Sequence, residues 1–270
     1  MSEQTTGLAR TAQILRFLIK YRTAGVFSGL DQDAALQAAE VEVEHAEQAG
    51  KPEEFVRDLE ALGPTFIKLG QALSTRHDMV PADYLAALER MQDKVAPLSI
   101  ETVREVVEEE LGVRLNKMFV EFDEKPLGST SLAQVHRAVM RDGREVAVKV
   151  QRPDAISSVR TDLEALKSIA GKIERGTDIG RRLKFGDWVS EFGRTLLAEL
   201  DYRVEAENLQ RFGDRMRDYP RLIIPSPVWS LCGKRVLTMD LVRGRKVTEI
   251  TGLERTDKPL GELASDLLRA

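Results

Sequence analysis

Apolar residues recur three or four positions apart over most of the first 115 residues, which is the spacing of one buried helix face. The clearest helix is predicted to begin at Gly63-Pro64, because proline suits a first helical position that needs no amide donor. Its buried face comprises Leu62, Phe66, Leu69 and Leu73. Further helices are predicted from Pro81 and from Ser99, the latter ending at Gly112. This part of the chain is therefore expected to be almost entirely helical.

The pattern then changes to that of strands. Residues 133–138 and 145–150 alternate in the manner of strands, and the turn signal Asp142-Gly143 separates them. Together they predict an antiparallel β-hairpin. Residues 154–215 return to helical spacing, and residues 234–242 predict another strand. The expected fold class is α+β, with a small antiparallel sheet that follows a helical N-terminal extension.

Residues 8–28 predict a basic amphipathic helix with two open interpretations. Its apolar side carries Ile14, Leu15, Leu18 and Ile19, and its basic residues are Arg10, Arg16, Lys20 and Arg22. Such a helix can lie on an anionic membrane surface. The alternative, which we favour, is a terminal helix packed on its own domain. The acidic, alanine-rich residues 30–52 are expected to form a helix followed by a turn at Gly50.

Composition narrows the function classes. The net charge of −4 gives no electrostatic support to a general nucleic-acid role. No apolar stretch approaches the roughly 20 residues that span a bilayer, and the sequence from Met1 carries no secretory signal. We therefore expect a cytoplasmic protein whose membrane contact, if any, is peripheral and at the inner face.

Cysteine and histidine usage argues against disulfides and metal clusters. The single Cys232 excludes an intramolecular disulfide and fits a reducing compartment. The three histidines, His45, His77 and His136, lack the spacing of metal ligands. No structural metal site is expected.

Lys149 is the first candidate residue for a nucleotide-binding site. It ends the run Val146-Ala147-Val148-Lys149, which resembles the Val-Ala-Ile-Lys pattern of the third strand of protein kinases. A rigid strand can hold one ammonium against the α- and β-phosphates of ATP. A lysine on a strand usually points to solvent, so the position of Lys149 after a small-residue loop and a hairpin turn is what favours the functional interpretation.

Three further motifs resemble those of one family, the UbiB-type atypical kinases, also called AarF or ADCK-like proteins. They are Lys68-Leu69-Gly70-Gln71, the small-residue loop and strand from Pro126 to Ala138, and Glu199-Leu200-Asp201 with the helix that follows it. Together with residues 146–153 they cover residues 62–208 in the family's order. The chain is identified as a member of this family, which implies a protein-kinase-like N-lobe.

The resemblance implies a helix inserted over the active site. In the family the lysine and glutamine of the Lys-x-Gly-Gln helix meet the Glu-x-Asp carboxylates and restrict access to protein substrates. Lys68 and Gln71 would inherit this role, with Glu199 and Asp201 as partners. Gly70 would allow another element to approach closely. Without the resemblance, the polar side of this helix would simply be a solvated face.

The resemblance also implies the residues that hold the nucleotide. The loop comprises Gly128, Ser129, Thr130 and Ser131, in place of the family's alanines, and an ordinary turn is its alternative. Met239 and Leu241 would lie at the hinge, where backbone groups reach adenine, although a simple edge strand explains them nearly as well. The expected cofactors are ATP and Mg²⁺, with the metal ligands outside this chain.

Glu205 is the expected ion-pair partner of Lys149, and Glu207 is expected to face solvent. Glu199 and Asp201 differ by two positions, so on one helix they would point about 200° apart. If both belong to the site, a helix must start or distort there. The four carboxylates are therefore predicted to have different roles.

The implied function is that of an ATP-binding, kinase-like protein that hydrolyses ATP rather than phosphorylating proteins, in ubiquinone biosynthesis or membrane-lipid homeostasis. The alternative is a non-catalytic module that binds a nucleotide or a membrane. Expected partners are a nucleotide, a membrane surface or quinone-biosynthesis proteins, and not nucleic acid.

Four parts are expected along the chain. Residues 1–60 form a helical extension, 61–115 the Lys-x-Gly-Gln region, 116–245 the kinase-like N-lobe, and 246–270 the start of a C-lobe. No catalytic-loop aspartate or Mg²⁺-binding aspartate is found before Ala270, so no catalytic residue is assigned. We expect a truncated C-lobe with exposed apolar surface that promotes self-association.

Overall fold

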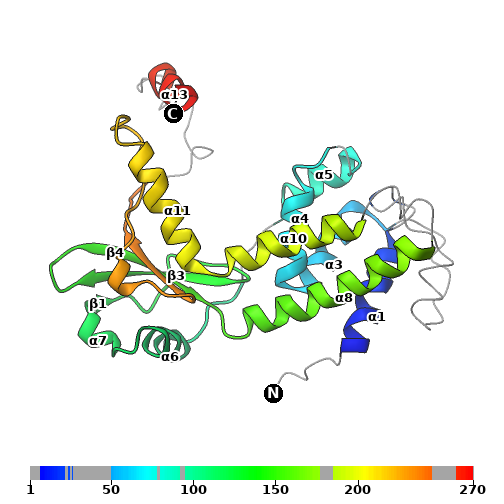
Figure 1. Cartoon of the computed structure of the whole chain (residues 1–270), viewed down its shortest axis with the longest axis horizontal. Helices are drawn as coiled ribbons and strands as arrows, with labels where there is room; N and C mark the ends of the chain where they lie inside the picture. The colour runs from blue at the N-terminus through cyan, green and yellow to red at the C-terminus, as the bar shows by residue number, and fades with distance from the viewer. Residues whose placement is uncertain are drawn as a thin grey trace. The chain divides into compact units, whose positions relative to one another are not determined.

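The computed structural model describes two compact units (Figure 1). The described residues are 7–21, 24, 26, 50–77, 80–91, 95–176, 185–244 and 260–269. Unit 1 comprises residues 1–95, 130–132 and 152–198, and unit 2 comprises residues 96–129, 133–151 and 199–270. This division differs from the four parts expected from the sequence, because the helix from residue 100 belongs with the sheet and the helices between residues 155 and 198 belong to unit 1.

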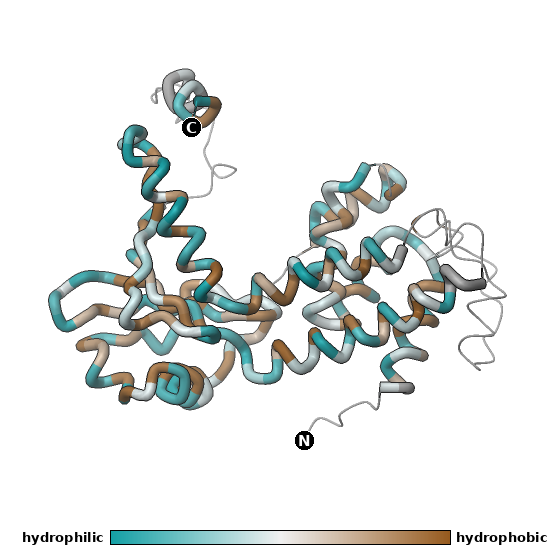
Figure 2. Tube along the Cα trace, viewed as in Figure 1, coloured by the Kyte–Doolittle hydropathy of each residue, from teal (hydrophilic) through white to brown (hydrophobic). Residues whose placement is uncertain are grey.

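Unit 1 is helical. Its elements are α1 (Gly7–Lys20), α3 (Pro52–Leu62), α4 (Pro64–Leu73), α5 (Ala82–Leu88), α8 (Ala155–Gly176) and all but the last residue of α10 (Phe185–Glu199). Apolar and polar positions alternate around these helices, as Figure 2 shows along α8. The helix starts predicted at Pro64 and Pro81 are confirmed within one residue. The helix expected at 30–52 lies almost wholly outside the described residues.

An aromatic cluster forms the centre of unit 1. Phe55 is fully buried, and its ring centroid lies 4.8 Å from that of Tyr21 and 5.4 Å from those of Phe17 and Tyr84. The apolar face of α1, including Phe17, and the adjoining Tyr21 are therefore buried within their own unit. The favoured interpretation of the N-terminal segment, a helix packed on its own domain, agrees with this arrangement.

A buried carboxylate joins three helices of unit 1. Asp162 on α8 is 2% exposed, and its two oxygens accept hydrogen bonds of 2.6 Å from Arg10 Nε on α1 and from Thr65 Oγ1 on α4. A buried charge is tolerated only where it is paired and hydrogen-bonded. Because both oxygens are satisfied, Asp162 sets the positions of α1 and α4 against α8.

The close approach predicted at Gly70 is present. A Cβ placed on Gly70 of α4 would lie 2.7 Å from Met91 Cε and 3.1 Å from Leu59 Cδ1. Real Cβ atoms essentially never come within 3.0 Å of another heavy atom. Glycine at this position therefore allows α3 and Met91 to pack directly on the α4 backbone.

Unit 2 is built on an antiparallel sheet. Its strands are β1 (Phe119–Phe122), β2 (Gly128–Ser129), β3 (Ala133–Met140), β4 (Glu145–Gln151) and β5 (Val236–Asp240). The order is β1-β3-β4-β5, and β2 also pairs with β3. The hairpin predicted from Asp142-Gly143 joins β3 to β4, and Gly143 adopts the φ of +85° that favours glycine. Neither β1 nor the short helix α7 (Leu115–Met118) before it was predicted.

The two faces of this sheet are covered by different helices (Figure 1). Helix α6 (Ile100–Leu111), capped by Ser99 as predicted, packs its valines against Val146, Val148 and Val150 of β4. Helix α11 (Tyr202–Arg215) packs Tyr202 and Ala206 against the other face. Side chains alternate between faces along a strand, so Lys149 points to the side of α11.

The remaining described elements of unit 2 are the short helix η2 (Trp229–Leu231) and helix α13 (Leu260–Arg269). Most of the segment predicted as the start of a C-lobe, residues 246–259, lies outside the described residues. In the part of the chain that the structure describes, no helix has both the length and the apolar character that crossing a bilayer requires.

Candidate functional site

An ion pair between β4 and α11 forms the centre of the candidate site. Lys149 Nζ lies 2.9 Å and 2.7 Å from the two carboxylate oxygens of Glu205, although 56 positions separate the residues. Both side chains are partly exposed, at 23% for Lys149 and 33% for Glu205. The predicted partnership of these two residues is therefore present as a bidentate contact that solvent can reach.

Tyr202 contacts Lys149 through the face of its ring. The Lys149 ammonium lies 4.7 Å from the centroid of the Tyr202 ring, a favourable cation–π distance. Tyr202 is 2% exposed, and its burial raises the pKa of the phenol, so the ring stays neutral. Gln151, also buried, bonds the Leu200 carbonyl at 2.8 Å and holds the turn before α11. Nothing in the sequence pointed to these contacts, because Tyr202 and Gln151 look like ordinary core residues.

A row of opposed residues crosses the sheet at Lys149. Val135 of β3 lies between Gly128 of β2 and Lys149 of β4 and pairs with both. Lys149 pairs in turn with Leu237 of β5. Opposed residues share a face, so Gly128 is directed to the same face as Lys149. A Cβ added at Gly128 would meet nothing within 4 Å, so the space above this backbone is open.

The predicted phosphate loop is divided between the units. Gly128 and Ser129 form β2 in unit 2, whereas Thr130 and Ser131 belong to unit 1. In unit 1 the Thr130 carbonyl accepts a 2.8 Å hydrogen bond from Arg152 Nε. A shared role for the four residues in holding phosphate stays a prediction.

Met239 and Leu241 lie at the end of the strand that borders Lys149. Met239 pairs with Ala147 of β4, so it shares the face of Lys149 and packs beside the α11 core. The Leu241 amide donates a 3.3 Å hydrogen bond to the Glu145 carbonyl, which engages it with the sheet. Their proposed contact with adenine stays a prediction.

The chain turns between two helices at the Glu-x-Asp element. Helix α10 ends at Glu199, and Asp201 caps α11 by accepting a 3.2 Å hydrogen bond from the Arg203 amide. The Arg203 guanidinium also binds the Asp201 carboxylate and lowers its pKa. The helix start that the spacing required is therefore present.

Lys68 and Gln71 both lie half-buried on α4 in unit 1, with Gly70 buried between them. Asp201 and Glu199 belong to unit 2. The pairing of the Lys-x-Gly-Gln helix with these carboxylates stays a prediction.

Comparisons with known proteins assign the chain to a family. The family model described as the ABC1 atypical kinase-like domain matches residues 90–270. The chain belongs to this ABC1 family. Unit 2, with its small antiparallel sheet, has the fold of a kinase-like N-lobe.

Curated relatives include proteins named "Probable protein kinase UbiB". The relative from Cellvibrio japonicus is 34% identical over 256 residues, which cover 94% of this chain and 46% of the relative. That from Azotobacter vinelandii is 40% identical over 195 residues, which cover 72% and 36%. The chain thus spans less than half the length of these relatives. A solved structure of Rv3197 with erythromycin, from Mycobacterium tuberculosis, is 31% identical, covers 71% of this chain and 48% of that one, and gives a TM-score of 0.49.

The ABC1 domain of this protein also contains a buried network of hydrogen bonds that the sequence did not reveal. On the α6 face of the sheet, the Leu98 amide donates to Gln134 Oε1 at 2.7 Å, and Gln134 Nε2 lies 2.8 Å from His136 Nε2. His136 Nδ1 lies 2.7 Å from the Asp123 carbonyl, which only accepts. These partners require a neutral ring that donates from Nδ1 and accepts at Nε2. His136, considered above only as a metal ligand, is a structural residue.

The neutral state of His136 predicts a pH-dependent stability. Burial lowers the pKa of His136 from its usual 6.5, so between that value and the lowered pKa the unfolded chain binds more protons. The free energy of unfolding should therefore fall as pH decreases below 6.5, by up to about 1.4 kcal/mol per pH unit. Urea unfolding of wild type and His136→Gln between pH 7.5 and 5.5 measures this loss.

The pH dependence of the free energy of unfolding is expected to be lost in His136→Gln. It is expected to remain in His77→Gln, which changes an exposed histidine. An equal slope in wild type and His136→Gln would contradict the assignment.

Metal ligation finds no support in the geometry. Among the described residues, no group of three or more His, Cys, Asp or Glu side chains is arranged to hold a metal ion. His45 lies outside the described residues.

Proposed function

We propose that unit 2 is the nucleotide-binding lobe of an ATP-using atypical kinase, and that Lys149 holds the phosphates of Mg-ATP. The observation that carries this proposal is the bidentate Lys149–Glu205 pair, with distances of 2.9 Å and 2.7 Å. In kinase-like lobes such a glutamate fixes the strand lysine so that it reaches the α- and β-phosphates.

The surroundings of the pair fit an anionic ligand. The Lys149 ammonium is only partly covered, and the backbone at Gly128 in the same row of the sheet is open. Glu205 and the Tyr202 ring would orient the ammonium, while Mg²⁺ would neutralise phosphate charge. No residue of this chain is proposed as a Mg²⁺ ligand.

The wider role rests on the family resemblance. We propose ATP hydrolysis rather than protein phosphorylation as the reaction, and isoprenoid-quinone biosynthesis or membrane-lipid homeostasis as the process, with peripheral membrane contact. These statements concern the full-length relatives, of which the chain spans less than half.

Thermal unfolding with and without Mg-ATP tests the nucleotide site. At an ATP concentration 100-fold above its Kd, the free energy of unfolding of the wild type should rise by about 2.7 kcal/mol. Lys149→Ala should lose this stabilisation, because the ammonium that would hold the phosphates is gone. Lys167→Ala removes an exposed lysine of α8 and should keep it.

Two results would count against the proposal. One is the absence of any Mg-ATP effect on the wild type, which would favour a non-catalytic binding module. The other is an unchanged effect in a Lys149→Ala protein whose circular dichroism spectrum matches that of the wild type.

A further inference from the structure

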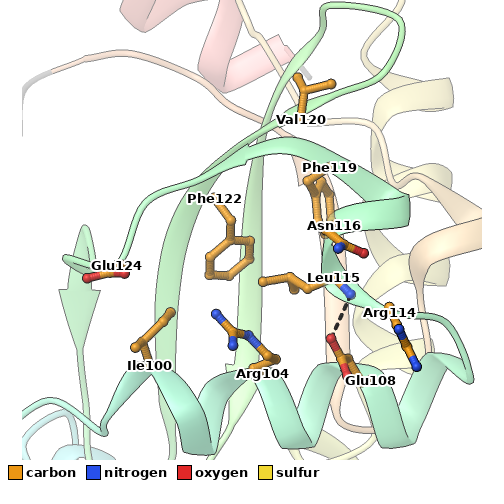
Figure 3. Close-up of a pocket in the computed structure, with 10 residues that line it drawn as sticks. All are labelled: Ile100, Arg104, Glu108, Arg114, Leu115, Asn116, Phe119, Val120, Phe122 and Glu124. Carbon is orange, nitrogen blue, oxygen red and sulfur yellow. Dashed lines mark hydrogen bonds between the residues drawn. The ribbon is translucent and has the colours of Figure 1, made fainter.

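A second pocket lies on the side of the unit 2 sheet that faces away from Lys149. It is bounded by α6, α7 and β1, and its volume is about 430 Å³. Figure 3 shows its lining side chains converging from these three elements. Small-molecule sites commonly have volumes of about 300–1,000 Å³, so the pocket is large enough for a small ligand.

One part of this pocket is apolar. Phe119 and Leu115 are 3% and 7% exposed and belong to the core beneath α6. The Phe122 ring, half-buried, lies 5.7 Å from that of Phe119 and 5.1 Å from that of His136. Ile100 completes this wall from α6. An apolar chain placed here would lose contact with water.

The other part of the pocket is charged and includes two arginines, Arg104 and Arg114. In the described parts of the chain, neither Arg104 nor Arg114 forms an ion pair or a side-chain hydrogen bond. Figure 3 shows Arg104 rising from α6 between Ile100 and Leu115. Glu108 is already engaged, because its Oε1 accepts a 2.8 Å hydrogen bond from the Leu115 amide.

Glu124 is the remaining carboxylate of the lining. Figure 3 places it on the opposite side of the pocket from Arg114, and its side chain is exposed. Guanidinium groups bind carboxylates and phosphates through two parallel hydrogen bonds. Arg104, which lies beside Ile100 and Leu115 in Figure 3, therefore matches an anion next to the apolar wall.

We propose that the pocket between α6, α7 and β1 binds a small amphipathic anion, a carboxylate or phosphate monoester that carries an apolar chain. The apolar chain of the ligand lies against Phe119, Phe122 and Leu115, and the anion is bound by Arg104. This site is separate from the proposed nucleotide site, because it lies on the opposite face of the sheet.

Calorimetric titration of the 270-residue chain with matched eight-carbon probes tests the proposal. Octanoate and octyl phosphate should bind, whereas octanol lacks the anion and inorganic phosphate lacks the chain, so both should bind at least about tenfold more weakly. Octylamine carries the wrong charge and should bind no better than octanol. Equal binding of octanol, or tighter binding of octylamine, would overturn the proposal.

Variants then assign the binding to this pocket. Arg104→Gln should weaken the binding of octanoate and octyl phosphate about tenfold or more, because a hydrogen-bonded charge is lost. Arg160→Gln removes an exposed arginine of α8 and should leave the affinity unchanged. Lys149→Ala should also leave it unchanged. Wild-type affinity in a folded Arg104→Gln protein, or loss of affinity in Lys149→Ala, would refute the assignment.

The anion has two sources, a free amphiphile or a lipid headgroup. Co-sedimentation with vesicles that contain phosphatidic acid, a phosphate monoester, compared with phosphatidylcholine vesicles, separates them. Pelleting that requires Arg104 would support the proposal with a membrane lipid as the ligand. Octanoate binding that requires Arg104, without such pelleting, would support it with a free amphiphile as the ligand.

Discussion

Replacing Asp162 with alanine is expected to lower the free energy of unfolding by about 3–5 kcal/mol. Asp162 is 2% exposed and binds both Arg10 and Thr65 at 2.6 Å. The variant would leave the Arg10 guanidinium, whose side chain is only 14% exposed, without its counter-charge. It would also release α1 and α4 from α8. Urea unfolding followed by the fluorescence of Trp188, which packs against the core of unit 1, measures the loss.

Matched variants separate this network from a general effect of substitutions in α8. Trp229 in unit 2 is 49% exposed, so a Trp229→Phe background leaves Trp188 as the reporter. Glu164→Ala removes an exposed carboxylate of the same helix and should change stability by less than about 0.5 kcal/mol. Thr65→Val leaves one oxygen of the buried Asp162 carboxylate without its hydrogen bond and should cost about 1–3 kcal/mol. A loss below 1 kcal/mol for Asp162→Ala would show that the buried pair contributes little.

Replacing Phe55 with alanine is expected to lower the free energy of unfolding by a similar amount, about 3–5 kcal/mol. Phe55 is fully buried, and its ring contacts those of Phe17, Tyr21 and Tyr84 at centroid distances of 4.8–5.4 Å. Alanine would leave a cavity at the point where α1, α3 and α5 meet. The same Trp188 fluorescence assay in urea measures this loss.

The control for the cavity is Phe55→Leu, which keeps most of the volume. It should cost less than the alanine variant by at least about 1.5 kcal/mol, because the cavity is smaller. Equal losses for the two variants would mean that aromatic geometry, and not volume, determines the stability of this cluster.

Local patterns predicted the elements that lie close together in sequence. The hairpin of β3 and β4 followed from alternation on both sides of Asp142-Gly143, and the structure contains it. The spacing of Glu199 and Asp201 implied that a helix starts or distorts there if both belong to the site, and α10 ends at Glu199 while α11 begins at Tyr202. In each case the physical cause acts within a few residues, so the sequence alone displays it.

Contacts between distant positions were predictable only where a resemblance supplied the partner. Glu205 was chosen for Lys149 because kinase-like lobes contain such a pair, and the ion pair is present. No resemblance pointed to Asp162, whose partners lie 97 and 152 positions away. An aspartate on a helix is usually solvated, so its burial depends on packing that spacing does not reveal.

The short strand β1 was missed for a related reason. Phe119–Phe122 is four residues long, and only its pairing with β3 and the burial of Phe119 make it a strand. His136 was evaluated as a metal ligand, but its role depends on the Asp123 carbonyl and Gln134. Backbone carbonyls have no signature in the sequence, so such partners become visible only in the folded chain.

The alternation of buried valines with Lys149 along β4 has a consequence for the register in which this strand pairs. Val146, Val148 and Val150 are fully buried beneath α6, and Lys149 lies between two of them on the opposite face. A shift of the strand by one residue would exchange the faces, burying the ammonium and exposing three valines. The three valines, which would not contact a nucleotide, thus favour the strand register in which Lys149 lies on the side of α11.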